Sequence, residues 1–159
     1  MPRRHFTAES YSARNSVGYL LRRSLNLILP RYEALFADHG FTFVQWAVLM
    51  YLREGLAQTA SDICRDFNYD SGALTRVVDQ LEQRGLIERS RSTSDRRLVE
   101  LALTDEGRAA TEATIPLVVD FFNLVFEDFS EAEVATLIEL LHRTIERLQQ
   151  LPSPPEADR

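Results

Sequence analysis

The sequence predicts a mainly α-helical protein that carries one small β-hairpin. Apolar residues recur every three or four positions over most of the 159 residues, the spacing of amphipathic helices. Only between Leu86 and Leu103 does the spacing fall to two, which is typical of strands. We therefore expect a helix-turn-helix with a hairpin at 39–107, flanked by helical regions at 1–38 and 108–151.

The N-terminal region should contain one long helix. Residues 1–11 show no clear period, so we expect a frayed end or an arm. Residues 12–38 are helical in pattern and rich in Leu and Ile, which suggests a surface for a partner as well as for the core. Pro30 interrupts this segment and should kink or break the helix near Leu29.

Two capping-box patterns predict where the next two helices begin. Thr42 and Gln45 have the spacing of a capping box, which predicts a helix at 43–54 with Trp46, Leu49, Met50 and Leu52 facing inward. Thr59 and Asp62 repeat the spacing before a short helix that should end at Phe67. In that helix Cys64 faces inward beside Ile63, and we expect an inert structural thiol.

A second helix follows after the three-residue link 68–70, the length that a helix-turn-helix uses. Leu74, Val77, Val78 and Leu81 form its apolar face. Asp70 or Ser71 should cap its start, and Gly85 fits its end. The opposite face is polar and consists of Thr75, Arg76, Asp79, Gln80 and Gln83.

The hairpin should carry a basic tip at 90–97, with Arg91, Arg96 and Arg97. A helix followed at once by such a hairpin is a winged helix. The helix fits a major groove about 12 Å wide, while the tip can reach phosphates or the minor groove. Residues 84–97 hold five Arg against two acids, a local charge of +3 on a chain of net charge −6. A winged helix that binds proteins instead of DNA is the alternative.

Two long helices should follow the hairpin. Thr104 is placed to cap a helix from Asp105 to about Asp128, in which Pro116 should cause a bend. Ser130 and Glu133 form a capping box for a last helix with apolar residues at a spacing of three or four up to Leu148. The tail 152–159 is polar and proline-rich and should be disordered.

The run ALTRVVDQLEQRGLIERSRSTSDRRLVELALTDEG, preceded by Ser71–Gly72, resembles the core of the MarR family of bacterial transcription regulators. The resemblance implies a cytoplasmic homodimer, formed by 1–38 and 108–151, that binds a pseudo-palindromic operator as a repressor. It implies that Arg97 enters the minor groove and that Asp95 supports the wing. The expected DNA contacts are Ser71, Thr75, Arg76, Gln80, Arg91 and Arg97.

Many MarR-like proteins bind aromatic carboxylates, and the resemblance suggests a similar pocket here. Trp46 and Met50 lie where relatives line that pocket, and Arg22 or Arg23 could pair with the carboxylate. The release of the repressor by a small aromatic or phenolic ligand follows from this reading. In the alternative reading Trp46 and Met50 are ordinary core residues and both arginines face water.

Other classes of protein find little support in the sequence. The single cysteine excludes an internal disulfide, and the three histidines lie far apart, without the spacing of a metal site. No nucleophile-elbow motif is present, and we expect neither an enzyme nor a cofactor. The chain has no apolar run of membrane-spanning length and its N-terminus does not resemble a signal peptide, which makes the cytoplasm the expected compartment.

Overall fold

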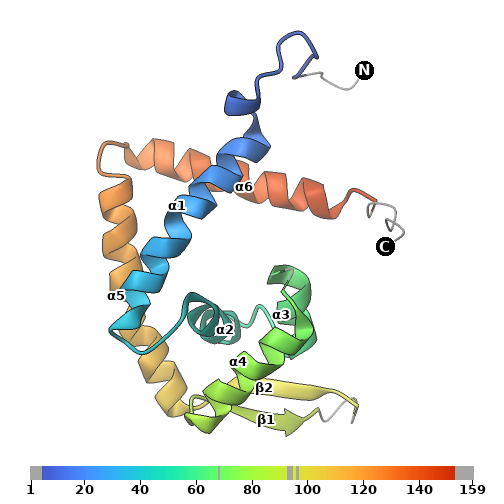
Figure 1. Ribbon diagram of the computed structural model, residues 1–159, viewed down its shortest axis with the longest axis vertical. Helices are drawn as coiled ribbons and strands as arrows, with labels where there is room; N and C mark the ends of the chain where they lie inside the picture. The colour runs from blue at the N-terminus through green and yellow to red at the C-terminus, as the bar shows by residue number, and fades with distance from the viewer. Residues whose placement is uncertain (1–4, 68, 93–94, 96, 153–159) are drawn as a thin grey trace. The chain divides into compact units, whose positions relative to one another are not determined.

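The computed structural model describes residues 5–67, 69–92, 95 and 97–152. The chain forms two compact units, Met1–Val118 and Val119–Arg159, each of which is described by itself. Figure 1 traces the elements along the chain. They are a 3₁₀ turn at Ala13–Asn15, α1 (Val17–Ala37), α2 (Phe43–Arg53), α3 (Ala60–Phe67), α4 (Ser71–Gln83), β1 (Ile87–Arg91), β2 (Val99–Leu103), α5 (Asp105–Val125) and α6 (Glu131–Gln149). The expected mainly α fold with one hairpin is confirmed.

The first helix begins later than predicted, and of the kink or break expected at Pro30 the break is not seen. It begins at Val17 instead of residue 12, because the Ser16 side chain accepts a hydrogen bond from the Tyr19 N–H and so caps the helix there. It also continues through Pro30 without a break. Next to the proline, Arg31 Nη1 donates to the Leu27 carbonyl at 2.6 Å.

The helix starts that were predicted from local spacing are confirmed. Complete capping boxes join Thr42 to Gln45 and Ser130 to Glu133. Thr59 and Asp62 exchange the same pair of hydrogen bonds before α3. Asp70 accepts from the Ala73 N–H at 2.7 Å, so it is Asp70 rather than Ser71 that caps α4.

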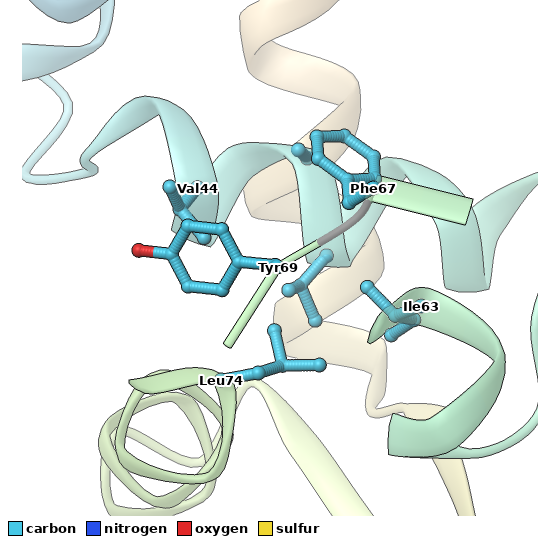
Figure 2. Close-up of a pocket in the computed structure, with 7 residues that line it drawn as sticks. Val44, Ile63, Phe67, Tyr69 and Leu74 are labelled. Atoms are coloured by element: carbon cyan, nitrogen blue, oxygen red, sulfur yellow. The ribbon is translucent and has the colours of Figure 1, made fainter. Parts of the chain in front are cut away.

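The core of the first unit forms where α2, α3 and α4 meet. Figure 2 shows the side chains of Val44, Ile63, Phe67, Tyr69 and Leu74 converging from these three helices and the link before α4. The hollow between them is too small to admit a water molecule, so the helices are closely packed. Each fully buried leucine or isoleucine contributes about 1.5–3 kcal/mol, and such burial fixes α4 against the rest of the unit. Fully buried side chains include Phe36, Val48, Leu49, Ile63, Leu74, Val78, Leu81 and Ile87.

The hairpin is anchored on both sides. β1 and β2 pair antiparallel with Ile87 opposite Leu103 and Arg91 opposite Val99, so β1 extends two residues into the segment 90–97 that was expected to form the tip. The Leu101 N–H donates to the Gln58 carbonyl at 2.8 Å, which ties β2 to the link between α2 and α3. In Figure 1 the hairpin lies beside α4, in agreement with the packing of β1 against that helix.

The start of α5 is pressed against the turn between α4 and β1. Thr104 caps α5 by accepting from the Gly107 N–H, and its own hydroxyl donates to the Gly85 carbonyl at 2.7 Å. Gly107 is required here because a Cβ on this residue would lie 1.8 Å from the Leu86 carbonyl oxygen. Gly85 has a φ of 70°, the left-handed conformation expected at the end of α4.

The second unit contains the end of α5 and all of α6. Phe122 stacks on Phe126, and Phe126 meets Phe129 edge to face. These rings and the apolar face of α6 line an open groove of about 720 Å³. In α6 no residue is buried, and its leucines and isoleucines are largely exposed. Within the described residues, no helix is long and apolar enough to cross a membrane.

Candidate nucleic-acid interface

The polar face of α4 points away from the core. Ser71, Thr75, Arg76 and Gln80 are all exposed, as expected from their positions opposite Leu74, Val78 and Leu81. They span less than three turns of one helix, so the structure brings them together on one surface. An exposed helix with this composition has the shape and donor groups that a major groove accepts.

Two of these side chains already have a partner within the protein. The Thr75 hydroxyl donates to the Ser71 carbonyl at 2.8 Å, so its methyl group and remaining lone pairs are left for a ligand. Gln80 Oε1 accepts a hydrogen bond from Gln45 Nε2 at 2.9 Å. The outward face of α4 is therefore partly oriented before any DNA binds.

The tip of the hairpin is held by its own backbone. The Asp95 carboxylate accepts from the Arg97 N–H at 3.0 Å, and the Asp95 carbonyl accepts from the Leu98 N–H at 2.9 Å. The Ser92 N–H donates to the Leu98 carbonyl at 3.0 Å, which closes the loop. Arg91 and Arg97 are exposed on this hairpin, whereas Arg96 lies outside the described residues.

Two arginines of residues 84–97 make contacts within the protein. Arg84 Nη1 donates to the Gly40 carbonyl at 2.8 Å, and its guanidinium lies 4.6 Å from the centre of the Phe41 ring. Arg89 bonds Asp79 at 2.6 Å and also pairs with Glu82, which joins β1 to α4. The hydrogen bond with Asp79 and the nearby Glu82 charge raise the pKa of Arg89 above its ordinary value. Of the five arginines in residues 84–97, Arg84 and Arg89 therefore hold the elements around α4 together. Arg91 and Arg97 are exposed on the hairpin.

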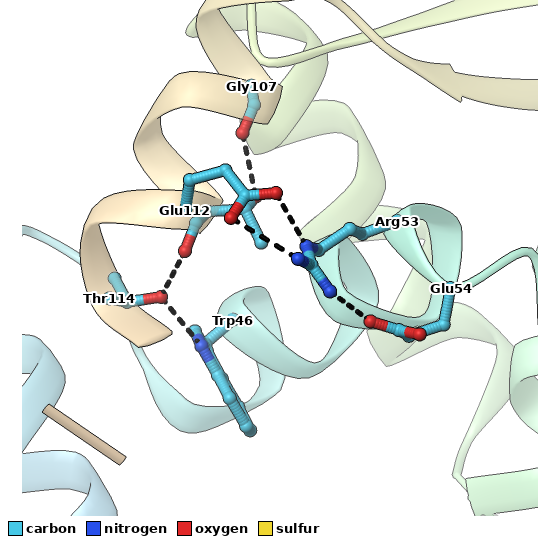
Figure 3. A network of polar contacts seen from close by, with 7 residues as sticks. Trp46, Arg53, Glu54, Gly107, Glu112 and Thr114 are labelled. Carbon is cyan, nitrogen blue, oxygen red and sulfur yellow. Dashed lines mark hydrogen bonds and ion pairs between the residues drawn. The ribbon is translucent and has the colours of Figure 1, made fainter. Parts of the chain in front are cut away.

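A polar network fixes α2 to α5 (Figure 3). Trp46 Nε1 donates to the Thr114 hydroxyl at 3.0 Å, and that hydroxyl donates to the Thr111 carbonyl. Arg53 Nε donates to Glu112 at 2.8 Å and pairs with Glu54 as well. The hydrogen bond from Arg53 lowers the pKa of the Glu112 carboxyl. Because α2 also packs against the inner face of α4, this network helps to fix the position of the candidate DNA-binding surface.

The residues expected to bind a small ligand are not gathered in one place. Trp46 stacks on Phe36 with ring centres 4.5 Å apart and also touches Tyr32. Arg22 and Arg23 are exposed and line a shallow hollow with Tyr19 and Asn26. They precede Tyr32 by about ten residues on α1, a rise of about 15 Å, so they lie far from Trp46. Met50 is half-buried on α2.

Metal binding and cysteine chemistry gain no support from the geometry. Within residues 5–67, 69–92, 95 and 97–152 no group of three His, Cys, Asp or Glu side chains could hold a metal ion. Cys64 is half-buried on α3 and the chain contains no second cysteine. Its expected inertness stays a prediction.

Three residues with a clear positional role escaped the sequence analysis. Gln45 was expected only as a capping residue, Asp79 only as part of a polar face, and Arg89 only as one of the five arginines in residues 84–97. Each makes a contact with a residue distant in sequence, and periodicity does not indicate such contacts. The one available signal was the excess of arginine in 84–97, which did not separate structural from exposed guanidinium groups.

The sequence model of the MarR family matches residues 41–99. An organic hydroperoxide resistance transcriptional regulator of Bacillus subtilis (strain 168) is 30% identical over 134 residues, covering 81% of this chain and 91% of that protein. Wild-type MarR from E. coli, in its apo form, aligns with a TM-score of 0.71 at 28% identity, covering 81% of this chain and 96% of that chain.

A further solved structure concerns a ligand. BpsR of Bordetella bronchiseptica, described with the regulation of its DNA binding by 6-hydroxynicotinic acid, aligns with a TM-score of 0.70 at 28% identity. The alignment covers 84% of this chain and 96% of that chain. The similarity to these proteins therefore extends well beyond residues 41–99 into the helices on both sides.

Proposed function

Because the chain belongs to the MarR family of transcription regulators, we propose that it is a homodimeric repressor that binds a pseudo-palindromic DNA operator and is released by a small aromatic ligand. The observation that carries the proposal is the pairing of an exposed polar α4 with an adjacent hairpin whose tip presents Arg97. A recognition helix with an arginine wing beside it suits a major groove and the neighbouring minor groove.

In this proposal α4 and the hairpin contact different parts of the DNA. Ser71, Thr75, Arg76 and Gln80 face base edges and phosphates, and Arg91 binds the backbone beside them. Arg97 enters the minor groove, where the negative potential attracts a guanidinium. Asp95 supports the wing by fixing the Arg97 backbone. Such a local basic surface can act on a chain of net charge −6 because the acids are concentrated elsewhere, with 10 acids against 3 Arg in residues 109–159.

The homodimer is supported by apolar surface that the single chain leaves uncovered. On α1 the exposed apolar side chains include Val17, Leu20, Leu21, Leu25 and Leu27. In the second unit the groove formed with α6 is lined mostly by apolar side chains. We assign the dimer contacts to 1–38 and 108–151, with 39–107 as the DNA-binding part. A two-fold dimer would present two copies of α4 to half-sites about 34 Å apart.

The proposed ligand is an aromatic carboxylate or a phenol, acting in the cytoplasm where a bacterial operator lies. BpsR is a relative whose DNA binding is regulated by 6-hydroxynicotinic acid, a molecule of this class. Arg22 and Arg23 offer two guanidinium groups beside the Tyr19 ring. Trp46 and Met50 remain candidate pocket residues, although the aromatic packing of Trp46 favours a structural role.

A selection from double-stranded DNA with a random core, followed by gel shifts at two salt concentrations, tests the DNA-binding part. We expect enrichment of a pseudo-palindrome and a steep loss of affinity with salt, because bound arginines release counterions from the phosphates. A protein-interaction module would enrich no sequence. Sedimentation at micromolar concentration tests the dimer, and a stable folded monomer would contradict it.

The ligand requires a separate test. Thermal-shift measurements with phenolic and hydroxynicotinic acids should identify a compound that stabilises the protein, and the same compound should release the selected DNA. Release by a coupling of about 1–3 kcal/mol corresponds to a five- to 150-fold loss of affinity. By linkage, saturating DNA must weaken ligand binding by the same factor. Stabilisation without any effect on DNA affinity would contradict a regulatory ligand.

A further inference from the structure

Gln45 and Gln80 form a hydrogen-bonded pair of amides between α2 and the exposed face of α4. Gln45 is 8% exposed and Gln80 is exposed, so the pair runs from the protein interior to the candidate DNA-binding surface. Gln45 Nε2 donates to Gln80 Oε1 at 2.9 Å. The two residues lie 35 positions apart, and capping alone does not require this contact.

The orientation of both amides follows from one backbone group. The Thr42 N–H can only donate, and it lies 3.1 Å from Gln45 Oε1 in the capping box of α2. Gln45 therefore has its oxygen at the cap and its nitrogen toward α4. That nitrogen can only donate, so Gln80 must turn its oxygen inward and its nitrogen outward.

We propose that Gln45 is a positioning residue which makes Gln80 a donor toward the major groove. Among the described residues no partner takes up the Gln80 amide hydrogens. With its oxygen turned inward to Gln45, Gln80 cannot present a donor and an acceptor side by side in the groove, which the usual bidentate contact to adenine needs. It is matched instead to base edges that only accept, namely O6 and N7 of guanine or O4 of thymine.

The inference rests on the proposed DNA-binding function and adds to it a base preference at one position. At one position in each half-site the protein should prefer guanine or thymine on the contacted strand. Gln80 lies one turn beyond Arg76 on the same side of α4, so this position should neighbour the one contacted by Arg76. The preference should be at least about fivefold over the other two bases.

The Gln45→Glu variant tests the orientation directly. Glutamate suits the third position of a capping box, so α2 keeps its cap and the protein should stay folded. A carboxylate cannot donate, however, and Gln80 must turn its nitrogen inward to pair with it. Its oxygen then faces the groove and accepts from N4 of cytosine or N6 of adenine. In selection from a random DNA library, the preference at that one position should reverse.

A second variant tests the orientation of the Gln80 amide while Gln45 is kept unchanged. In Gln80→Glu the carboxylate accepts from Gln45 Nε2 and exposes only acceptor oxygens, so the preference should again move to cytosine or adenine. Gln80→Ala should remove the preference, and Gln45→Glu in that background should change no position further. Gln83→Ala is the matched control, a glutamine also exposed on α4 without a partner among the described residues, and it should leave this position unchanged.

The outcomes separate the two proposals. If the wild-type chain selects no sequence, the DNA-binding function itself fails. If it selects a site, and neither Gln45→Glu nor Gln80→Glu alters the preferred base at any position, the orientation of Gln80 is overturned. A uniform loss of affinity on all sequences, without a change of preference, also overturns it, because that result reflects only the added negative charge.

Discussion

The Asp95 carboxylate accepts a hydrogen bond from the backbone N–H of Arg97 at 3.0 Å, two residues further along the hairpin tip. This contact forms an Asx turn, in which a short acidic side chain takes the place of a backbone carbonyl. It fixes the backbone from which the Arg97 side chain projects into solvent. The Asp95 carboxylate therefore acts on the loop, and its charge is partly engaged by the Arg97 backbone.

Arg97→Ala should weaken binding to the selected DNA and lower the slope of log K against log salt by about 1, since one phosphate-neutralising charge is lost. Unfolding free energy should change by less than about 0.5 kcal/mol, because the side chain is exposed. Asp95→Ala should cost less affinity and leave the slope unchanged, because it only loosens the loop. Gel shifts over a salt series give both quantities, and an unchanged slope in Arg97→Ala would mean that the wing does not touch DNA.

Arg89→Ala should reduce DNA affinity although its guanidinium is engaged by two carboxylates of α4. Its guanidinium pairs with Asp79 and Glu82, and without it two carboxylates on α4 are left uncompensated near the DNA. The loss should be largest at low salt. The triple change Arg89→Ala, Asp79→Asn, Glu82→Gln should restore much of the affinity. If the triple variant binds no better than Arg89→Ala, the role of Arg89 lies in the position of β1 and not in charge.

Gly107→Ala should strongly destabilise the folded protein. The added methyl group would meet the Leu86 backbone oxygen at 1.8 Å, and neither the turn after α4 nor the start of α5 can move without disturbing buried neighbours. We expect a loss of about 3 kcal/mol or more in unfolding free energy, measured by urea denaturation. Gly18→Ala is the control, because nothing lies within 4 Å of a Cβ there. Equal stability of the two variants would contradict the close approach.

Local sequence patterns predicted the helix starts because capping depends on residues three apart. The boxes at Thr42 and Ser130 therefore appear in the structure as expected. The alternation of apolar and polar residues, which is also a local pattern, predicted the hairpin but did not indicate that β1 extends to Arg91. Of the kink or break expected at Pro30, the break does not occur, since a proline on an exposed helix loses one hydrogen bond but need not end the helix.

The contacts that orient the site could not be predicted in this way. Trp46 and Thr114 are 68 residues apart, and the residue types alone do not indicate that an indole would find this hydroxyl. The same holds for Gln45 and Gln80 across 35 residues. The sequence predicted which residues of α4 face outward, because that follows from helical geometry. It did not predict how their polar groups are turned, because that depends on tertiary neighbours.

Asp62 should make the stability of the first unit depend on acid pH. A hydrogen bond from the Thr59 hydroxyl, with others from the Gln58 and Thr59 N–H groups and from Arg65, lowers the pKa of this carboxyl. A lowered pKa in the folded state means stability that is present above the unfolded value of roughly 3.9 and is lost as pH falls through the folded value. The stability difference between wild type and Asp62→Asn should thus be constant near pH 7 and shrink below pH ~4. Urea unfolding across this range gives the result, and a difference independent of pH would contradict it.

Trp46 offers the sharpest test between a core residue and a ligand contact. Its indole stacks on Phe36 and donates to Thr114, whose side chain is fully buried. If this role is structural, Trp46→Phe should cost about 2–4 kcal/mol of unfolding free energy through the lost hydrogen bond and the space left behind. Thr114→Val should also destabilise the protein, and the double variant should show a coupling of about 0.5–1.5 kcal/mol.

Trp46→Phe also tests whether Trp46 contacts a ligand, when the release of DNA by that ligand is measured. A purely structural Trp46 predicts that Trp46→Phe, at a temperature where it stays folded, releases DNA at the same ligand concentration as the wild type. The paired change of Arg22 and Arg23 to alanine should then be the one that impairs release, because those guanidinium groups are exposed and free to meet a carboxylate. If Trp46→Phe instead leaves stability unchanged and shifts the ligand concentration tenfold, Trp46 lines the pocket and the aromatic cluster around it must open to admit the ligand.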